Sequence, residues 1–162
     1  MTQLSLNADD IELSHIHKED TSVLLQIIND NETCRYLHSL YKLLNEENGI
    51  SIFIESFDKY HEEGSGFLWG IRQNNSLIGF IALMDIPIKP FIFYAMHPIF
   101  RRRGYMKKCL SKVVNTCISQ FSLPFIMTYV LPDNVISIHL LTSVCFQFDG
   151  YNAEGMEIYK YQ

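Results

Sequence analysis

The spacing of apolar residues changes from a strand-like to a helix-like period shortly after residue 16. The segment 11–16 begins with alternating apolar and polar residues, which predicts a short edge strand. Helical spacing follows three times before residue 66. It is strongest where apolar residues recur at i, i+3, i+4 and i+7, namely Ile50, Phe53, Ile54 and Phe57. Asp20 can cap the first of these helices, and either Asp30 or Asn31 can cap the second. Gly64 can end the third.

Strand-like runs dominate the middle of the chain. The runs 67–72 and 77–83 are apolar and flank the sequence Gln73-Asn74-Asn75-Ser76, which predicts a hairpin. The run 91–96, FIFYAM, is apolar throughout and is expected to be buried on both faces. The broadest apolar stripe of the chain follows and predicts a helix from about Gly104 to Ser119.

The remaining elements complete an α/β (α+β) pattern. A strand is predicted at 125–131, then a helix capped by Asp133 or Asn134, then a closing hairpin between 146 and 161. The order β-α-α-α-β-β-β-α-β-α-β-β predicts a mixed, mostly antiparallel sheet flanked by helices. The runs 91–96 and 125–131, joined by the long helix, form its parallel pair. Residues 1–162 are expected to form a single domain.

Composition and charge exclude several classes of protein. The chain of 162 residues is 48% hydrophobic, which excludes a disordered protein. Its net charge of −5 argues against a nucleic-acid partner and against an anionic membrane. No apolar run reaches the ~18 residues of a membrane span, and Met1–Asp10 lacks the pattern of a secretory signal, so a cytoplasmic location is expected. The four cysteines form no Cys-x-x-Cys pair and are expected to be buried hydrophobes.

Positive charge concentrates at the start of the long helix. Five of the 13 basic residues stand there, Arg101, Arg102, Arg103, Lys107 and Lys108. The N–H groups and the dipole of a helix N-terminus bind phosphate, Gly104 allows close backbone approach, and arginines add bidentate donors. The segment therefore predicts a site for a pyrophosphate-bearing ligand. The alternative is a solvated loop without a ligand.

The same segment resembles motif A of the GNAT (GCN5-related N-acetyltransferase) superfamily, whose loop reads Arg/Gln-x-x-Gly-x-Gly/Ala. Arg101, Gly104 and Met106 stand at those places, after the hydrophobic-x-Pro of Met96-His97-Pro98. The resemblance is of the RimJ/RimL type and extends over nearly the whole chain, including a motif B that begins at Asn134. It implies the GNAT fold, with a central splayed parallel strand pair. It also implies an N-acetyltransferase that moves an acetyl group from acetyl-CoA to a primary amine by direct attack on the thioester.

The resemblance implies which residues would hold acetyl-CoA. The backbone of Met96 would bind the pantetheine arm, and Asn134 and Ser137 would contact that arm and its thiol end. The pyrophosphate would lie against Arg101, Arg102, Arg103, Gly104, Tyr105, Met106 and Lys107. No metal is implied.

Four residues depart from the family pattern, and one of them is Lys107, where RimJ/RimL-type chains usually carry Thr. Arg102 and Met106 replace small residues of motif A, and Cys145 replaces the Gly of the Gly-Phe pair in motif B. A backbone N–H survives at Arg102 and at Met106, so ligand binding is expected to survive if neither residue needs a positive φ.

Acetyl transfer needs a deprotonated amine, donors for an oxyanion and a donor for the leaving thiolate. Leu141 stands where many family members carry a tyrosine, so Ser137 is the nearest candidate hydroxyl, with pantetheine binding as its alternative role. His97 and Tyr94 are further candidate catalytic residues at the end of the apolar strand. A water-mediated reaction without a dedicated base is an alternative.

The acceptor is expected to lie between the first helices and the last hairpin. Tyr36, Asp85 and Tyr151 are candidate contacts, and the acidic surplus outside the basic loop predicts a cationic amine. The RimJ/RimL resemblance favours a protein N-terminal amine, with a polyamine or an antibiotic as alternatives. An acyl-CoA-binding module that has lost catalysis is the alternative of another class. Many relatives dimerise, and the sequence leaves a homodimer open.

Overall fold

A hairpin and the strand that follows it form the centre of the sheet. β2 (Phe67–Gln73) and β3 (Ser76–Met84) are joined through Asn74 and Asn75, which both have a positive φ. Two-residue hairpins favour this conformation because it matches the twist of the strands. β4 (Phe91–Met96) then pairs antiparallel with β3 over its whole length. The predicted hairpin and the apolar strand are therefore confirmed.

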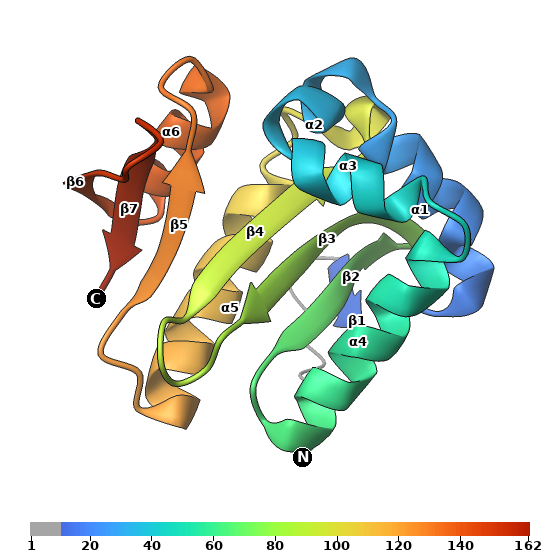
Figure 1. The fold of residues 1–162 in the computed structure, drawn as a ribbon, viewed down its shortest axis with the longest axis horizontal. Coiled ribbons are helices and arrows are strands. Elements are labelled where there is room, and N and C mark those ends of the chain that lie inside the picture. Colours follow the sequence, from blue (N-terminus) through green and yellow to red (C-terminus); the bar gives the residue numbers. More distant parts are fainter. Residues whose placement is uncertain (1–10) are drawn as a thin grey trace.

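The structure, a computed structural model, describes residues 11–162 as a seven-stranded sheet of order β1-β2-β3-β4-β5-β7-β6 (Figure 1). β1 (Ile11–Ser14) is an edge strand, as predicted, and β6 (Gln147–Tyr151) is the other edge. β5 (Ile126–Val130) runs parallel to β4, and β7 (Glu157–Tyr161) lies beside it. The remaining neighbours are antiparallel, which confirms the predicted mixed sheet.

β4 and β5 share one register pair, Phe91 with Met127, near the start of both strands. Beyond that pair the two strands diverge, and Figure 1 shows the gap widening toward their C-terminal ends. The parallel pair is thus splayed, as the resemblance implied. The expected burial of β4 on both faces is wrong for Phe91, Phe93 and Tyr94, which are half-buried, because no strand covers them on the side of the gap.

Helices cover both faces of the sheet (Figure 1). On one face lie α1 (Thr21–Ile28), α2 (Asn31–Tyr36), α3 (His38–Leu44) and α4 (Gly49–Glu63). On the other lies α5 (Tyr105–Phe121), and α6 (Val135–Ser143) connects β5 to β6. Two 3₁₀ turns, η1 (Lys18–Asp20) and η2 (Pro98–Phe100), precede α1 and the basic loop. Each face buries its own apolar cluster.

The second predicted helix is in fact two helices, α2 and α3. Leu37 interrupts it with φ −116° and ψ 45°, outside the helical region. Apolar spacing did not predict the break, because two short helices on the same face keep nearly the same period. Asp30 caps α2 as predicted and accepts a hydrogen bond from the Thr33 N–H.

Asp20 does not cap α1, contrary to expectation; it forms an ion pair with Arg72 of β2. Two oxygens of the carboxylate accept from Arg72 at 3.0 and 2.6 Å, and both side chains are 13% exposed. Arg72 also donates to Ser14 and to the His15 carbonyl, so it joins η1 to β1 and β2. Burial raises the pKa of Asp20, but the hydrogen bonds from Arg72 and from the His17 N–H outweigh it and hold the pKa below its ordinary value.

The expectation that the cysteines are buried is confirmed only in part. Cys109 and Cys117 are buried as expected, and burial raises the pKa of each thiol to about 12, whereas Cys145 is exposed. Met1–Asp10, expected to lack a secretory signal, lie outside the described residues. Within residues 11–162, no helix is long and apolar enough to span a membrane.

We expect Asp20→Asn to lower the free energy of unfolding by about 3 kcal/mol at neutral pH, because it leaves the guanidinium of Arg72 buried without its counter-charge. The folded pKa of Asp20 lies below the unfolded value, so the pair stabilises the protein above the unfolded pKa. That contribution is lost as the pH falls through the folded pKa. Urea unfolding of both proteins at neutral and strongly acidic pH measures the effect, and the difference should shrink in acid.

The matched control is Lys59→Ala, which removes an exposed ion pair with Glu63. It should change the free energy of unfolding by less than about 0.5 kcal/mol at either pH. Equal losses in the two variants would contradict a special role for the Asp20–Arg72 pair.

Candidate active site

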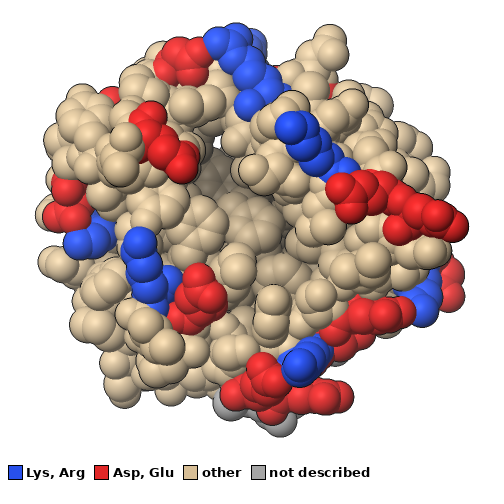
Figure 2. Space-filling model, viewed as in Figure 1, with Lys and Arg blue, Asp and Glu red and all other residues tan. Residues whose placement is uncertain are grey.

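The divergence of β4 from β5 opens a cleft of about 790 Å³. Its walls come from α2 and α3 on one side and from β5 and the start of α6 on the other, and the start of α5 adjoins it. Figure 2 shows a hollow at the centre of this face, with uncharged side chains inside and charged side chains around its rim. The cleft therefore lies where the resemblance placed acetyl-CoA.

The N-terminus of α5 has no side-chain cap. Gly104 precedes the helix with φ 78°, a conformation that glycine adopts without strain. The N–H groups of Tyr105, Met106 and Lys107 lie in the first turn, where a helix offers them no acceptor. All four residues line the cleft, so unpaired donors and the positive end of the helix dipole adjoin it.

Arg102 has φ 60°, in the left-handed region. The glycine of the family pattern would adopt this conformation freely, whereas a residue with a Cβ is strained by about 1–2 kcal/mol. The condition that the residue needs no positive φ is therefore not met at Arg102. It holds for Met106, which lies inside α5. Cys145, another departure from the family pattern, also has a positive φ, of 70°.

Arg101 lines the cleft, but its guanidinium is engaged with protein groups. It donates to Glu32 at 2.7 Å, to Asp30 at 2.6 Å and to Thr33 at 2.8 Å, while its Nε donates to the Met96 carbonyl at 3.1 Å. Burial raises the pKa of Asp30, but hydrogen bonds from Arg101 and from the Thr33 N–H outweigh it and lower the pKa. Arg101 thus ties the end of β4 to α2. Arg102 and Arg103, in contrast, are exposed at the cleft edge.

Two hydroxyl groups meet in the cleft between β4 and α6. The oxygen atoms of Tyr94 and Ser137 are 2.7 Å apart, and either can donate. Burial raises the pKa of Tyr94 above its ordinary value, although the hydrogen bond with Ser137 lowers it in part, so the tyrosine keeps its proton at neutral pH. Asn134 caps α6 by accepting from the Ser137 N–H at 3.2 Å. The structure therefore brings together three of the candidate residues, Tyr94, Ser137 and Asn134.

Three predicted site residues do not line the cleft. The His97 ring contacts Gln26 at 3.2 Å and accepts from the Ile99 N–H. Asp85 is exposed directly after β3, at the end of β4 opposite Met96. Tyr151 is 62% exposed on the edge strand β6, where its ring contacts Phe148.

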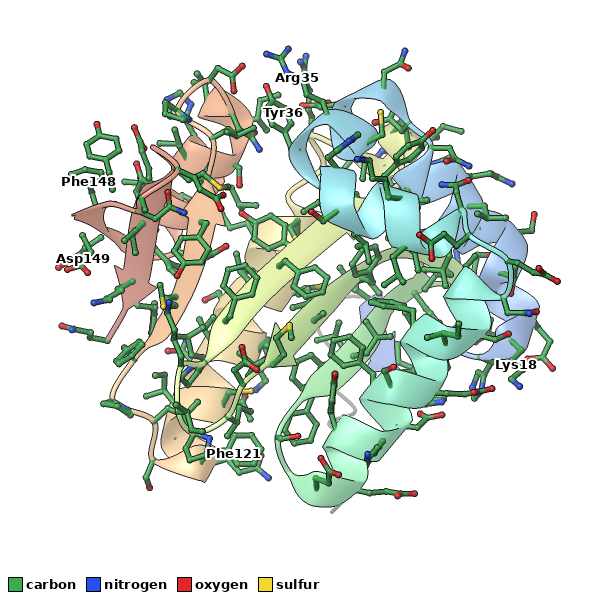
Figure 3. All side chains as sticks on the ribbon, viewed as in Figure 1. Lys18, Arg35, Tyr36, Phe121, Phe148 and Asp149 are labelled. Carbon is green, nitrogen blue, oxygen red and sulfur yellow. The ribbon has the colours of Figure 1, made fainter. Side chains whose placement is uncertain are left out.

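Among the predicted acceptor contacts, Tyr36 does line the cleft. Its hydroxyl donates to the carbonyl of Asp133 at 3.3 Å, and the neighbouring Arg35 forms an ion pair with the Asp133 carboxylate. These contacts join α2 to the segment before α6 across the cleft. Figure 3 shows Arg35 and Tyr36 beside that opening, and Phe148 and Asp149 at the outer edge of the sheet.

The aromatic lining of the cleft on β4 was not predicted from the sequence. Phe91 and Phe93 were assigned to a strand buried on both faces, yet they line the cleft together with Tyr129, whose ring lies 5.3 Å from that of Phe91. The signal that could have found them is the predicted splay itself. Side chains beyond the last shared pair of two diverging strands cannot all be covered.

The gap between β4 and β5 widens toward an uncapped, basic helix N-terminus. This arrangement suits an enzyme that holds a phosphate-bearing thioester, that is, an acyltransferase. A family model described as "Acetyltransferase (GNAT) domain" matches residues 10–147, and the chain belongs to this family. The chain is 30% identical over 150 residues to the uncharacterized N-acetyltransferase YoaA of Bacillus subtilis. The matched region covers 90% of this chain and 84% of that protein. The protein is an N-acetyltransferase.

Solved structures share the fold at low sequence identity. The RimL ribosomal L7/L12 alpha-N-protein acetyltransferase, solved with coenzyme A, is 17% identical with a TM-score of 0.82, covering 95% of this chain and 94% of that one. The spermidine N-acetyltransferase of Vibrio cholerae, solved with CoA and spermine, is 13% identical with a TM-score of 0.72 and covers 94% of each chain. These likenesses confirm the GNAT fold.

We expect Arg101→Met to lower the free energy of unfolding by about 2 kcal/mol, because Asp30 and Glu32 lose their shared partner. The amides of α2 should also exchange hydrogen faster, since the tie to β4 is lost. Urea unfolding and hydrogen exchange measure the two effects. Arg103→Met, on the exposed neighbour, is the control and should change stability by less than about 0.5 kcal/mol. Indistinguishable behaviour of the two variants would refute the structural role of Arg101.

Proposed function

We propose that the acetyl donor is acetyl-CoA and that the acetyl group moves to a primary amine held in the same cleft. The observation that carries this proposal is the uncapped N-terminus of α5 at the wide end of the gap between β4 and β5. It offers first-turn N–H groups from Tyr105 to Lys107 for a pyrophosphate, and Arg102, Arg103 and Lys107 add positive charge.

The pantetheine arm fits the open edge of β4. Beyond Phe91 this edge has no register partner in β5, so an extended amide chain can pair with the strand backbone toward Met96. The Met96 carbonyl already accepts from Arg101, which holds the end of the strand in place. Asn134 and Ser137 border the same gap from the start of α6, where the family pattern places contacts to pantetheine.

In the reaction the amine nitrogen attacks the thioester carbonyl, a C–N bond forms and the C–S bond breaks. A backbone N–H at the end of β4 stabilises the oxyanion. The Tyr94–Ser137 pair donates a hydrogen bond to the leaving thiolate. Because burial raises the pKa of Tyr94, it acts by hydrogen bonding while keeping its own proton. The amine loses its proton to water in the cleft, which His38 also lines, and the thiolate of CoA takes up a proton from water to leave as the thiol.

The acceptor amine is either a protein N-terminus or a small molecule. The fold that the chain shares with a protein α-N-acetyltransferase supports the first, and the fold shared with a polyamine acetyltransferase supports the second. The alternative function is an acyl-CoA-binding module without catalysis. The hydroxyl pair of Tyr94 and Ser137 in the cleft supports catalysis over this alternative.

The proposed function is tested by binding and turnover together. Acetyl-CoA should raise the melting temperature, and thiol release should follow when amines and peptides are added. If acetyl-CoA raises the melting temperature but no acceptor leads to thiol release, the result favours the binding module. Absence of both would overturn the proposal.

Replacing both Arg103 and Lys107 by Ala should weaken CoA binding by about tenfold and flatten its dependence on salt, because two cations near the pyrophosphate are lost. Isothermal titration calorimetry at two salt concentrations measures this. Lys112→Ala, on an exposed later turn of α5, is the matched control and should bind CoA as the unmodified protein does. Unchanged affinity in the double variant would place the pyrophosphate elsewhere.

Tyr94→Phe and Ser137→Ala should each lower kcat by about tenfold with little change in CoA affinity. The double variant should be no slower than either single variant, because the hydroxyls act as one pair. Tyr161→Phe, which removes a hydroxyl bonded to Asn115 outside the cleft, is the control. Reduced CoA affinity with unchanged kcat would assign the pair to pantetheine binding instead.

A further inference from the structure

Strand alternation divides the cleft lining into two sides. On β4, Tyr94 and Met96 pack toward the cluster that contains α5, whereas Phe93 packs toward the cluster under α1 and α4. Phe91 is two residues from Phe93 and therefore shares its face. The polar pair and the α5 N-terminus thus lie on one side, and the aromatic rings of β4 lie on the other.

The second side is completed by apolar groups from three more segments. Tyr129 of β5 lies against Phe91, Leu37 and Leu40 come from the α2–α3 region, and Met156 stands just before β7. We call these six residues, Phe91, Phe93, Tyr129, Leu37, Leu40 and Met156, the acceptor wall. Figure 2 shows this face of the molecule, where the hollow is uncharged inside.

The charges of the cleft do not suit a polycation. Among the described residues that line it, Glu32 is the one carboxylate, and it accepts from Arg101 at 2.7 Å. The basic lining residues are Arg35, Arg101, Arg102, Arg103 and Lys107. Asp85 and Tyr151, which were expected to favour a cationic amine, lie outside the cleft. A polyamine would meet like charges here without a free carboxylate to neutralise them.

We propose that the acceptor is a primary amine with an aromatic or large apolar group beside the amino group, and that this group lies against the acceptor wall. The inference rests on the proposed acetyl transfer and narrows its acceptor. The products are the N-acetylated amine and free CoA thiol. Burial of a ring against the wall explains why so many apolar side chains line a cleft open to water.

The first test compares acceptors at saturating acetyl-CoA. Thiol release is measured with phenethylamine, a peptide with N-terminal Phe, the same peptide with N-terminal Ser, and spermidine. We expect kcat/KM for at least one aromatic amine to exceed that for the Ser peptide and for spermidine by about tenfold or more. The two aromatic acceptors distinguish a small-molecule amine from a peptide N-terminus.

The second test alters the wall. Phe91→Ala should raise KM for the better aromatic acceptor by about tenfold, while acetyl-CoA affinity stays unchanged. The matched control is Phe148→Ala, on an exposed ring of β6 outside the cleft, which should leave KM unchanged. If Phe91→Ala does not fold, Met156→Glu serves instead. It adds a carboxylate and should reduce the preference for the aromatic acceptor over spermidine by about tenfold.

The outcomes separate this inference from the proposed function. If acetyl-CoA binds and CoA thiol is released, but spermidine or the Ser peptide is the best acceptor, the proposed acceptor class is overturned and the proposed acetyl transfer stands. Faster turnover with octanoyl-CoA, lost in Phe91→Ala, would also overturn it, because the wall would then hold an acyl chain. Absence of acetyl-CoA binding and of thiol release would overturn the proposed function and this inference with it.

Discussion

One shared register pair between two parallel strands determines where every functional group of this protein lies. β4 and β5 meet at Phe91 and Met127 and diverge beyond that point. A strand edge without a partner is normally a liability, since its backbone groups lack hydrogen-bond partners. Here the open edge borders a cleft that ends on the N-terminus of α5. The open edge of β4 and the N–H groups of the helix together support the proposed binding of an extended ligand with an anionic end.

The walls of the cleft are held by ion pairs between distant segments. Arg101, after β4, binds Asp30 and Glu32 of the α2 region, and Asp30 also caps α2. The carboxylate therefore orients the helix and the arginine together. Arg35 and Asp133 make a second, exposed connection across the cleft mouth, which solvent weakens. The protein thus anchors α2 more strongly to the end of β4 than to the segment before α6.

Local signals predicted much of the fold, because they depend on neighbouring residues. The asparagine turn of the central hairpin, the cap at Asp30 and the apolar stripe of α5 all follow from spacings of four residues or fewer. Contacts between distant segments could not be predicted in this way. Asp20 pairs with Arg72, and Arg101 is engaged by residues of α2, because the fold brings those partners within reach. The position of Asp85 outside the cleft, just past the pair of Met84 with Phe91, likewise follows from the pairing of β3 with β4.

The basic loop shows how the net charge conceals the character of the site. The chain is acidic overall, at −5, yet the described lining of the cleft carries five basic side chains and one carboxylate. Arg102 occupies this loop at the cost of a left-handed backbone, which glycine would adopt freely. The side chain that this strained backbone presents at the cleft edge is a cation. In the proposed complex the phosphates of CoA lie against this loop, and the apolar side of the cleft is left for the acceptor.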